Sequence, residues 1–116
     1  MNIGRAAELT GLPAKTIRYY EDIDLIEPIR AANGYRDYDD SDVHRLAFLK
    51  RARGLSLNIE ECRLLLSLYR DKGRASSDVK ALAVEKIEQI DNKLKELKSL
   101  RSTLALLAEN CTGDDR

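Results

Sequence analysis

The sequence predicts a mainly α-helical protein in which a small head of short helices is followed by one long helix. Helix-start and helix-stop residues recur at short intervals over residues 2–73, and an Asn-Gly turn interrupts them at residues 33–34. No proline or glycine occurs over residues 77–110. With 116 residues, 43% of them apolar, the chain can form only a small core. An apolar stripe on a projecting helix would therefore stay in water unless a second copy covered it.

Two short helices joined by a tight turn are predicted at the start of the chain. Asn2 is a good N-cap for the first helix, and Gly11 suits the left-handed residue that ends it. Pro13 fits the first position of a second helix that continues over residues 14–22. This is the helix-turn-helix pattern. Around the apolar Ile17, the second helix carries polar and aromatic residues: Lys15, Thr16, Arg18, Tyr19 and Tyr20.

The periodicity changes after the second helix. Glu27-Pro28 breaks the helical pattern, and Asn33-Gly34 supplies a turn whose central residues can take positive φ. Residues 29–30 and 35–38 on either side of this turn fit two very short strands. The sequence therefore predicts a wing beside the helix-turn-helix.

Two further helices and one long helix complete the predicted fold. Asp39 with Asp42 marks the start of a helix that ends near Gly54, and Asn58 with Glu61 marks the start of a helix that ends at residues 71–73. Along residues 77–110 the apolar residues recur at steps of three or four, which is typical of a coiled-coil seam. The expected dimerisation residues are Ile87, Ile90, Leu94, Leu97, Leu100, Leu104 and Leu107. The helix would be about 50 Å long, too long to fold back onto so small a head.

Composition excludes several classes of protein. Twenty basic and twenty acidic residues cancel, so net charge does not identify a partner. No segment has the apolar length that crosses a bilayer and no secretion signal opens the chain, so we expect a cytoplasmic protein without membrane partners. The two cysteines are too few for a disulfide framework or an iron–sulfur cluster. No nucleophile with a base, paired carboxylates or glycine-rich phosphate loop is present, so we expect no enzyme.

Cations lie on three predicted elements that could face one duplex. The second helix, the wing and the end of the third helix each carry them, and two short helices with a wing match a known DNA-binding geometry. Arginine and lysine there can bridge phosphates or pair with guanine in the major groove. The predicted DNA contacts are Lys15, Thr16, Arg18, Tyr19, Tyr20, Tyr35, Arg36 and Arg53. As an alternative, the charged residues form an ordinary solvated face, and the tyrosines, Tyr38 included, pack the core.

The motifs resemble those of a known family. The run of residues 17–21, Ile-Arg-Tyr-Tyr-Glu, is followed by Leu25 and Ile26 and then by Asn-Gly-Tyr-Arg at residues 33–36 and Tyr38. This pattern, with the two further helices and the long helix, is similar to that of the MerR family of transcription regulators over essentially the whole chain. The resemblance implies a winged helix-turn-helix DNA-binding domain followed by a long dimerisation helix that pairs as an antiparallel coiled coil.

The resemblance also implies a mode of action. A homodimer would bind a palindromic promoter whose spacer is too long, and effector binding would bend and undertwist the DNA so that RNA polymerase can use it. Such deformation is indirect readout. Among the predicted contacts, the resemblance points to Lys15, Arg18, Tyr20, Tyr35, Arg36 and Arg53.

Two residues near the long helix resemble those of the copper-responsive branch of the family. Cys111 matches the first ligand of a metal-binding loop, and Ser76 matches a selectivity position at which sensors of divalent ions have cysteine. The resemblance implies a site for Cu(I), with Ag(I) or Au(I) as alternatives, because thiolates suit these soft ions. The chain departs from the branch at one point: no second loop cysteine follows Cys111 before residue 116. Either a longer tail supplies it, or this regulator answers to a different effector.

The expected organisation is a DNA-binding domain over residues 1–70, the dimerisation helix and its lead-in over 71–110, and the start of a metal-binding loop over 111–116. Cys62 lies among apolar residues and is expected in the core. A different class of function remains open: the chain could be a coiled-coil interaction module without metal sensing.

Overall fold

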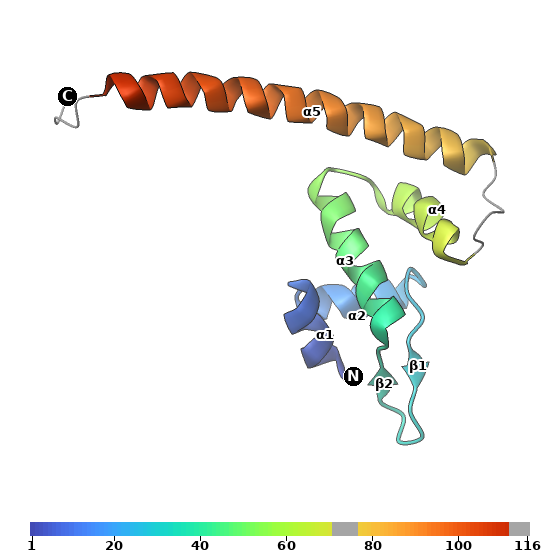
Figure 1. The fold of residues 1–116 in the computed structure, drawn as a ribbon. Helices are drawn as coiled ribbons and strands as arrows, with labels where there is room; N and C mark the ends of the chain where they lie inside the picture. Colours follow the sequence, from blue (N-terminus) through green and yellow to red (C-terminus); the bar gives the residue numbers. More distant parts are fainter. Residues whose placement is uncertain (71–76, 112–116) are drawn as a thin grey trace. The chain divides into compact units, whose positions relative to one another are not determined.

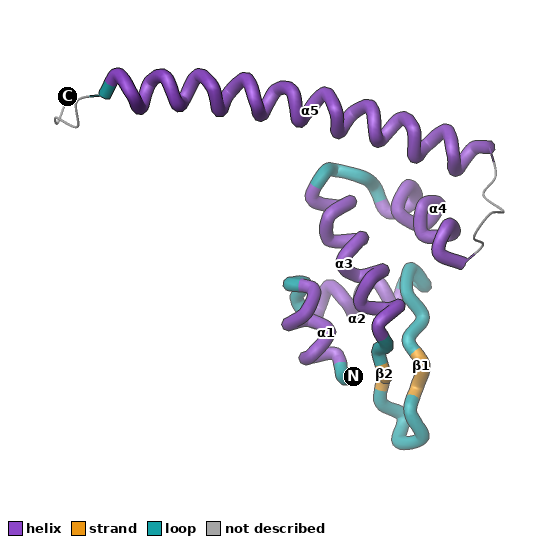
Figure 2. Tube along the Cα trace, viewed as in Figure 1, coloured by secondary structure: helices purple, strands orange, loops and turns teal. Residues whose placement is uncertain are grey.

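The computed structural model describes residues 1–70 and 77–111, which form two units. The first unit contains the helices α1 (Ile3–Thr10), α2 (Ala14–Asp22), α3 (Asp40–Gly54) and α4 (Ile59–Arg70), with the strands β1 (Ile29–Arg30) and β2 (Arg36–Asp37) (Figure 1). The second contains the single helix α5 (Ser77–Asn110). Figure 2 shows helices throughout the described chain and strand only in the short hairpin. The mainly α fold class is thus confirmed.

Local capping explains where the first two helices begin and end. The side chain of Asn2 accepts a hydrogen bond from the Arg5 amide at 2.9 Å, and Gly11 ends α1 at φ 76°. Pro13 differs from the prediction by one position, since its ψ of 144° places it outside the helix as the N-cap of α2. A proline preceding the first helical residue still presets the entry of the chain without removing a helical hydrogen bond.

The hairpin of β1 and β2 is the predicted wing. Ile29 pairs with Asp37 and Arg30 with Arg36 in antiparallel register. Gly34 turns the chain at φ 83°. The second strand is shorter than the predicted residues 35–38, because Tyr35 lies at the turn and Tyr38 enters the core.

Reciprocal caps begin α3 and α4. The Asp42 amide donates to Asp39 Oδ1 at 2.8 Å and the Asp39 amide donates to Asp42 Oδ2 at 3.0 Å. The backbone hydrogen bond from Asp42 lowers the pKa of the Asp39 carboxyl, whereas burial raises the pKa of the Asp42 carboxyl. Asn58 and Glu61 make the equivalent pair at α4, with distances of 2.8 and 3.0 Å.

One core holds the first unit together. Helix α1 packs on both α2 and α3, and α4 packs on α3. The fully buried side chains come from the four helices and from the segments that flank the hairpin: Ala6, Ile17, Ile26, Tyr38, Leu46, Leu49 and Cys62. The core therefore fixes α2 against α1, which leaves the other face of α2 exposed.

Helix α5 has 34 residues and keeps its apolar stripe exposed. The seven predicted dimerisation residues are between 37% and 61% exposed. Among the described residues, no helix is apolar enough over sufficient length to cross a membrane.

Candidate nucleic-acid interface

Helix α2 presents one face to solvent and the other to the core. Lys15, Arg18 and Tyr19 are exposed, and Thr16 is half-buried. Tyr20 differs from the prediction: its side chain is only 5% exposed and belongs to the core beside Ile17. Both face the core because they lie three residues apart on one side of the helix. Four of the five residues predicted on α2 thus remain available to a ligand.

The wing and α2 enclose an open cleft of about 640 Å³. Arg18 of α2 lies on one side, and Tyr35 and Arg36 of the wing line it as well. The lining is completed by Asn33 at the turn of the wing and by Asn2, Ile3 and Gly4 at the start of α1. Tyr35 is 74% exposed, an unusual position for an aromatic ring unless a partner covers it. The structure therefore brings together predicted contacts from two elements that lie far apart in sequence.

Arg53 lies apart from this cleft, at the end of α3. Its Nη1 donates to the Leu57 carbonyl at 2.9 Å, so the guanidinium also fixes the loop that follows the helix. Arginine carries five N–H donors, and one such bond leaves others for a phosphate.

A carboxylate that sequence reasoning missed joins α2 to the wing. Arg36 Nε donates to Glu21 Oε2, and Arg30 Nη2 lies 3.6 Å from Glu21 Oε1. Glu21 was visible in the quoted motif, but its partners are 9 and 15 residues away, and the strand register alone decides that both arginines reach it.

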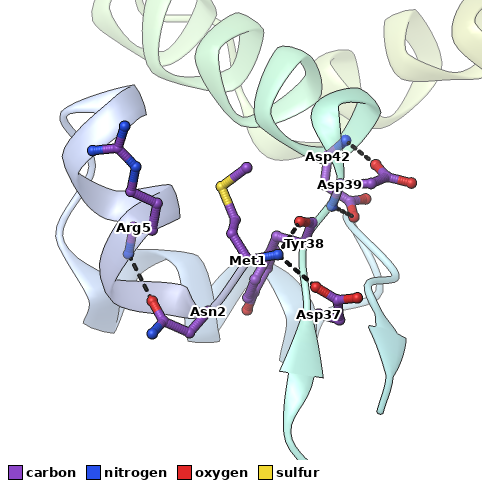
Figure 3. Close-up of polar contacts among 7 residues, drawn as sticks. All are labelled: Met1, Asn2, Arg5, Asp37, Tyr38, Asp39 and Asp42. Carbon is purple, nitrogen blue, oxygen red and sulfur yellow. Dashed lines mark hydrogen bonds and ion pairs between the residues drawn. The ribbon is translucent and has the colours of Figure 1, made fainter.

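The first residue of the chain also holds the wing (Figure 3). The Met1 ammonium donates to Asp37 Oδ1 at 2.5 Å and to the Tyr38 carbonyl at 2.7 Å. The Tyr38 amide donates back to the Met1 carbonyl at 2.8 Å. These bonds tie β2 to the start of α1, where Asn2 caps the helix.

Tyr38 is buried beneath these contacts. Its hydroxyl has no hydrogen-bond partner in the described part of the chain. Burial, and next the negative charge of Glu21, raise the pKa of this phenol above its usual 10.0. Tyr38 therefore acts as a core residue, and the four tyrosines of residues 1–40 divide into a buried pair, Tyr20 and Tyr38, and an exposed pair, Tyr19 and Tyr35.

The two cysteines lie in opposite environments. Cys62 is fully buried, as expected, and burial raises the pKa of its thiol. Cys111 is exposed directly after α5. Ser76 lies outside the described residues. Within residues 1–70 and 77–111, no three histidine, cysteine or acidic side chains gather as a metal site, and Cys111 contributes one exposed thiol.

A short helical pair with a wing and cations on its exposed surface, followed by a long helix with an exposed apolar stripe, define the class of winged helix-turn-helix DNA-binding proteins. Two family models match the chain: MerR HTH family regulatory protein over residues 1–68, and MerR, DNA binding, over residues 43–107. The chain belongs to the MerR family and is a transcriptional regulator, not an enzyme. Regulators of this family bind promoter DNA and function as dimers.

Individual relatives match along almost the whole chain. It is 60% identical to the HTH-type transcriptional regulator HmrR of Rhizobium leguminosarum bv. viciae, covering all of this chain and 90% of that protein. It is 44% identical to the HTH-type transcriptional regulator CueR of Salmonella typhimurium, over 99% of this chain and 84% of that protein. The crystal structure of PbrR691 from Ralstonia metallidurans CH34, in complex with lead(II), is similar with a TM-score of 0.65 and 33% identity, covering all of this chain and 90% of that one.

Proposed function

We propose that α2 and the wing form the surface that reads promoter DNA. The observation that carries this proposal is the cleft between them, because it gathers Arg18, Arg36 and the exposed ring of Tyr35 around a space open to solvent. Two guanidinium groups and an exposed ring beside one groove suit a phosphate backbone, because phosphate oxygens are anionic and accept hydrogen bonds from guanidinium groups.

The contacts divide by element. Lys15, Thr16, Arg18 and Tyr19 of α2 lie where a recognition helix meets base edges and phosphates in the major groove. Tyr35 and Arg36 of the wing reach the backbone beside that groove, and Arg53 meets a phosphate at the end of α3. Tyr20 is left out because it is buried.

Two copies pair through the exposed stripe of α5. Each copy then contributes one head to one half of a palindromic promoter. We propose that the dimer bends and undertwists a promoter whose spacer is too long, which lets RNA polymerase use it. The regulator would act where the promoter lies, in the cytoplasm.

Binding to a palindromic duplex tests the proposed surface. The duplex is one that the wild-type chain selects from a random-sequence pool, and binding is followed by fluorescence anisotropy. Arg18→Ala should weaken binding by about tenfold to a hundredfold, as expected for a lost arginine contact. Lys98→Ala removes the same charge from the exposed surface of α5 and should leave binding within about twofold. If both variants bind alike, α2 does not face the DNA.

We further propose that the effector is a metal ion and that Cys111 supplies one ligand. The thiolate, the resemblance to the copper-responsive branch and the serine at position 76 together favour Cu(I), with Ag(I) or Au(I) as alternatives. PbrR691, which is similar over the whole chain, holds lead(II) in its crystal structure. A linear Cu(I) site needs two thiolates, so Cys111 accounts for half of it.

Titration of the full-length dimer, with its native C-terminus, with cuprous ion under reducing conditions tests the metal proposal. Wild type should retain one ion for each Cys111, and Cys111→Ser should retain none. Cys62→Ala is the matched control, because this thiol is buried and should not contribute. Equal retention by wild type and Cys111→Ser would refute the proposal and favour a regulator for a different effector. Failure to bind any promoter duplex would instead favour a coiled-coil interaction module.

A further inference from the structure

Glu21 is the point at which the wing is joined to α2. Its side chain is only 14% exposed, although it lies one residue before the end of a surface helix. Its two carboxylate oxygens have different partners: Oε2 accepts from Arg36 Nε of β2, and Oε1 lies 3.6 Å from Arg30 Nη2 of β1. One side chain therefore holds both strands.

The wing needs such an anchor. Each strand has two residues, and an isolated two-stranded hairpin of this size is marginal in water. Ile29 is 70% exposed, so burial of the strand side chains contributes little. Apart from the bonds of Met1 to Asp37 and Tyr38, the polar contacts that hold the strands on the rest of the head are those of Glu21, among the described residues.

The same contact orients Arg36. A guanidinium is planar, so fixing Nε on the Glu21 carboxylate fixes the plane that carries Nη1 and Nη2. Arg36 also lines the cleft with Arg18 and Tyr35. With Nε occupied, the two terminal nitrogens are the donors left for a ligand in that cleft.

We propose that Glu21 is a positioning residue for DNA binding, which holds the wing on α2 and orients the terminal nitrogens of Arg36 toward a phosphate of the duplex. This inference rests on the proposed DNA surface. It assigns a role in binding an anion to a side chain that is itself an anion.

Electrostatics predicts the direction in which neutralising Glu21 should change the affinity for DNA. A carboxylate near a phosphate repels it, so if Glu21 were only a surface charge, its neutralisation would tighten DNA binding. If Glu21 acts through Arg36, neutralisation releases the guanidinium and the wing, and binding weakens because both must then be ordered when DNA binds. The two roles therefore predict opposite changes for the same substitution.

The test compares Glu21→Gln with Asp22→Asn on the duplex selected by wild type. Asp22 is the neighbouring carboxylate, is exposed and makes no ion pair in the described part of the chain. Glu21→Gln should weaken binding about tenfold, the loss expected for one charged hydrogen bond. Asp22→Asn should bind equally or more tightly. Unchanged or tighter binding by Glu21→Gln would overturn the proposal.

A double-mutant cycle shows whether Glu21 acts through Arg36. In the background of Arg36→Gln, the substitution Glu21→Gln should cost clearly less than the tenfold it costs in wild type, because only the contact with Arg30 is then left to lose. If the double variant instead loses affinity for DNA by the product of the two single-variant factors, Glu21 does not act through Arg36.

Side-chain ¹⁵N spectra of the DNA-free dimer give a readout that does not depend on any variant's stability. The Arg36 Nε–H of wild type should exchange slowly with water, and Asp22→Asn should retain this slowly exchanging signal. A rapidly exchanging Arg36 Nε–H in wild type would overturn the positioning role. If the signal is present but Arg18→Ala and Arg36→Gln bind DNA like wild type, the proposed DNA surface is wrong, and this inference is wrong with it. If Arg18→Ala weakens DNA binding but Glu21→Gln does not, only this inference is wrong.

Discussion

Leu97→Ala should weaken the dimer, because Leu97 lies in the middle of the exposed stripe of α5. In the isolated chain its side chain is 54% exposed. Burying a whole leucine side chain is worth about 1.5–3 kcal/mol, so covering the exposed half is worth about 1 kcal/mol. A symmetric dimer contains the residue twice, which gives about 2 kcal/mol and about a 30-fold rise in the dissociation constant.

Sedimentation equilibrium measures this constant directly. Lys95→Ala is the matched control, since it truncates an exposed side chain two residues away, near the opposite side of the same helix. It should change the constant by less than about threefold. A Leu97→Ala dimer as tight as wild type, or an equal loss in Lys95→Ala, would refute the assignment of the stripe as the dimer seam.

Three further substitutions test the packing of the head by chemical denaturation. Tyr38→Phe removes a buried hydroxyl without a partner among the described residues and should leave the free energy of unfolding unchanged or raise it by up to about 1 kcal/mol; a loss above that value would reveal a missed partner. Because the pKa of Tyr38 is raised in the folded state, the protonated phenol contributes its full share to the free energy of unfolding below pH 10.0. This contribution should decline as pH rises through the folded pKa, and Tyr38→Phe should abolish the decline. Gly11→Ala should cost about 1–2 kcal/mol, since φ is 76° and the new Cβ would lie 2.4 Å from Lys50 Nζ; equal stability would contradict the left-handed cap. Ser56→Gly should raise stability by about 0.5 kcal/mol because Ser56 has φ 69°, and a clear loss would count against that conformation.

The sequence predicted the helices well because their ends depend on local chemistry. Asn2 and Gly11 delimit α1, and reciprocal side-chain caps begin α3 and α4, as expected from residues no more than three apart. The length of α5 followed from the absence of proline and glycine. Each of these signals acts within one or two turns of backbone.

The parts that the sequence did not reveal depend on contacts between distant residues. The bonds of Met1 to Asp37 and Tyr38 span 36 and 37 residues, and the Glu21–Arg36 pair spans 15. Tyr20 was predicted at the DNA surface because it belongs to a polar run, but the packing of α2 on the core buries it. Which face of a short helix is buried depends on its neighbours, and nine residues are too few for periodicity alone to decide.

Photo-crosslinking from the aromatic residues of α2 and the wing tests the central claim most directly. Azidophenylalanine replaces Tyr19 or Tyr35, both exposed, or Leu64, which is exposed on α4 and serves as the control. Irradiation of the dimer on its selected duplex should join the protein to DNA from positions 19 and 35 and not from position 64. Crosslinks from position 64 alone, or equal yields at all three positions, would contradict the proposal that α2 and the wing face the promoter.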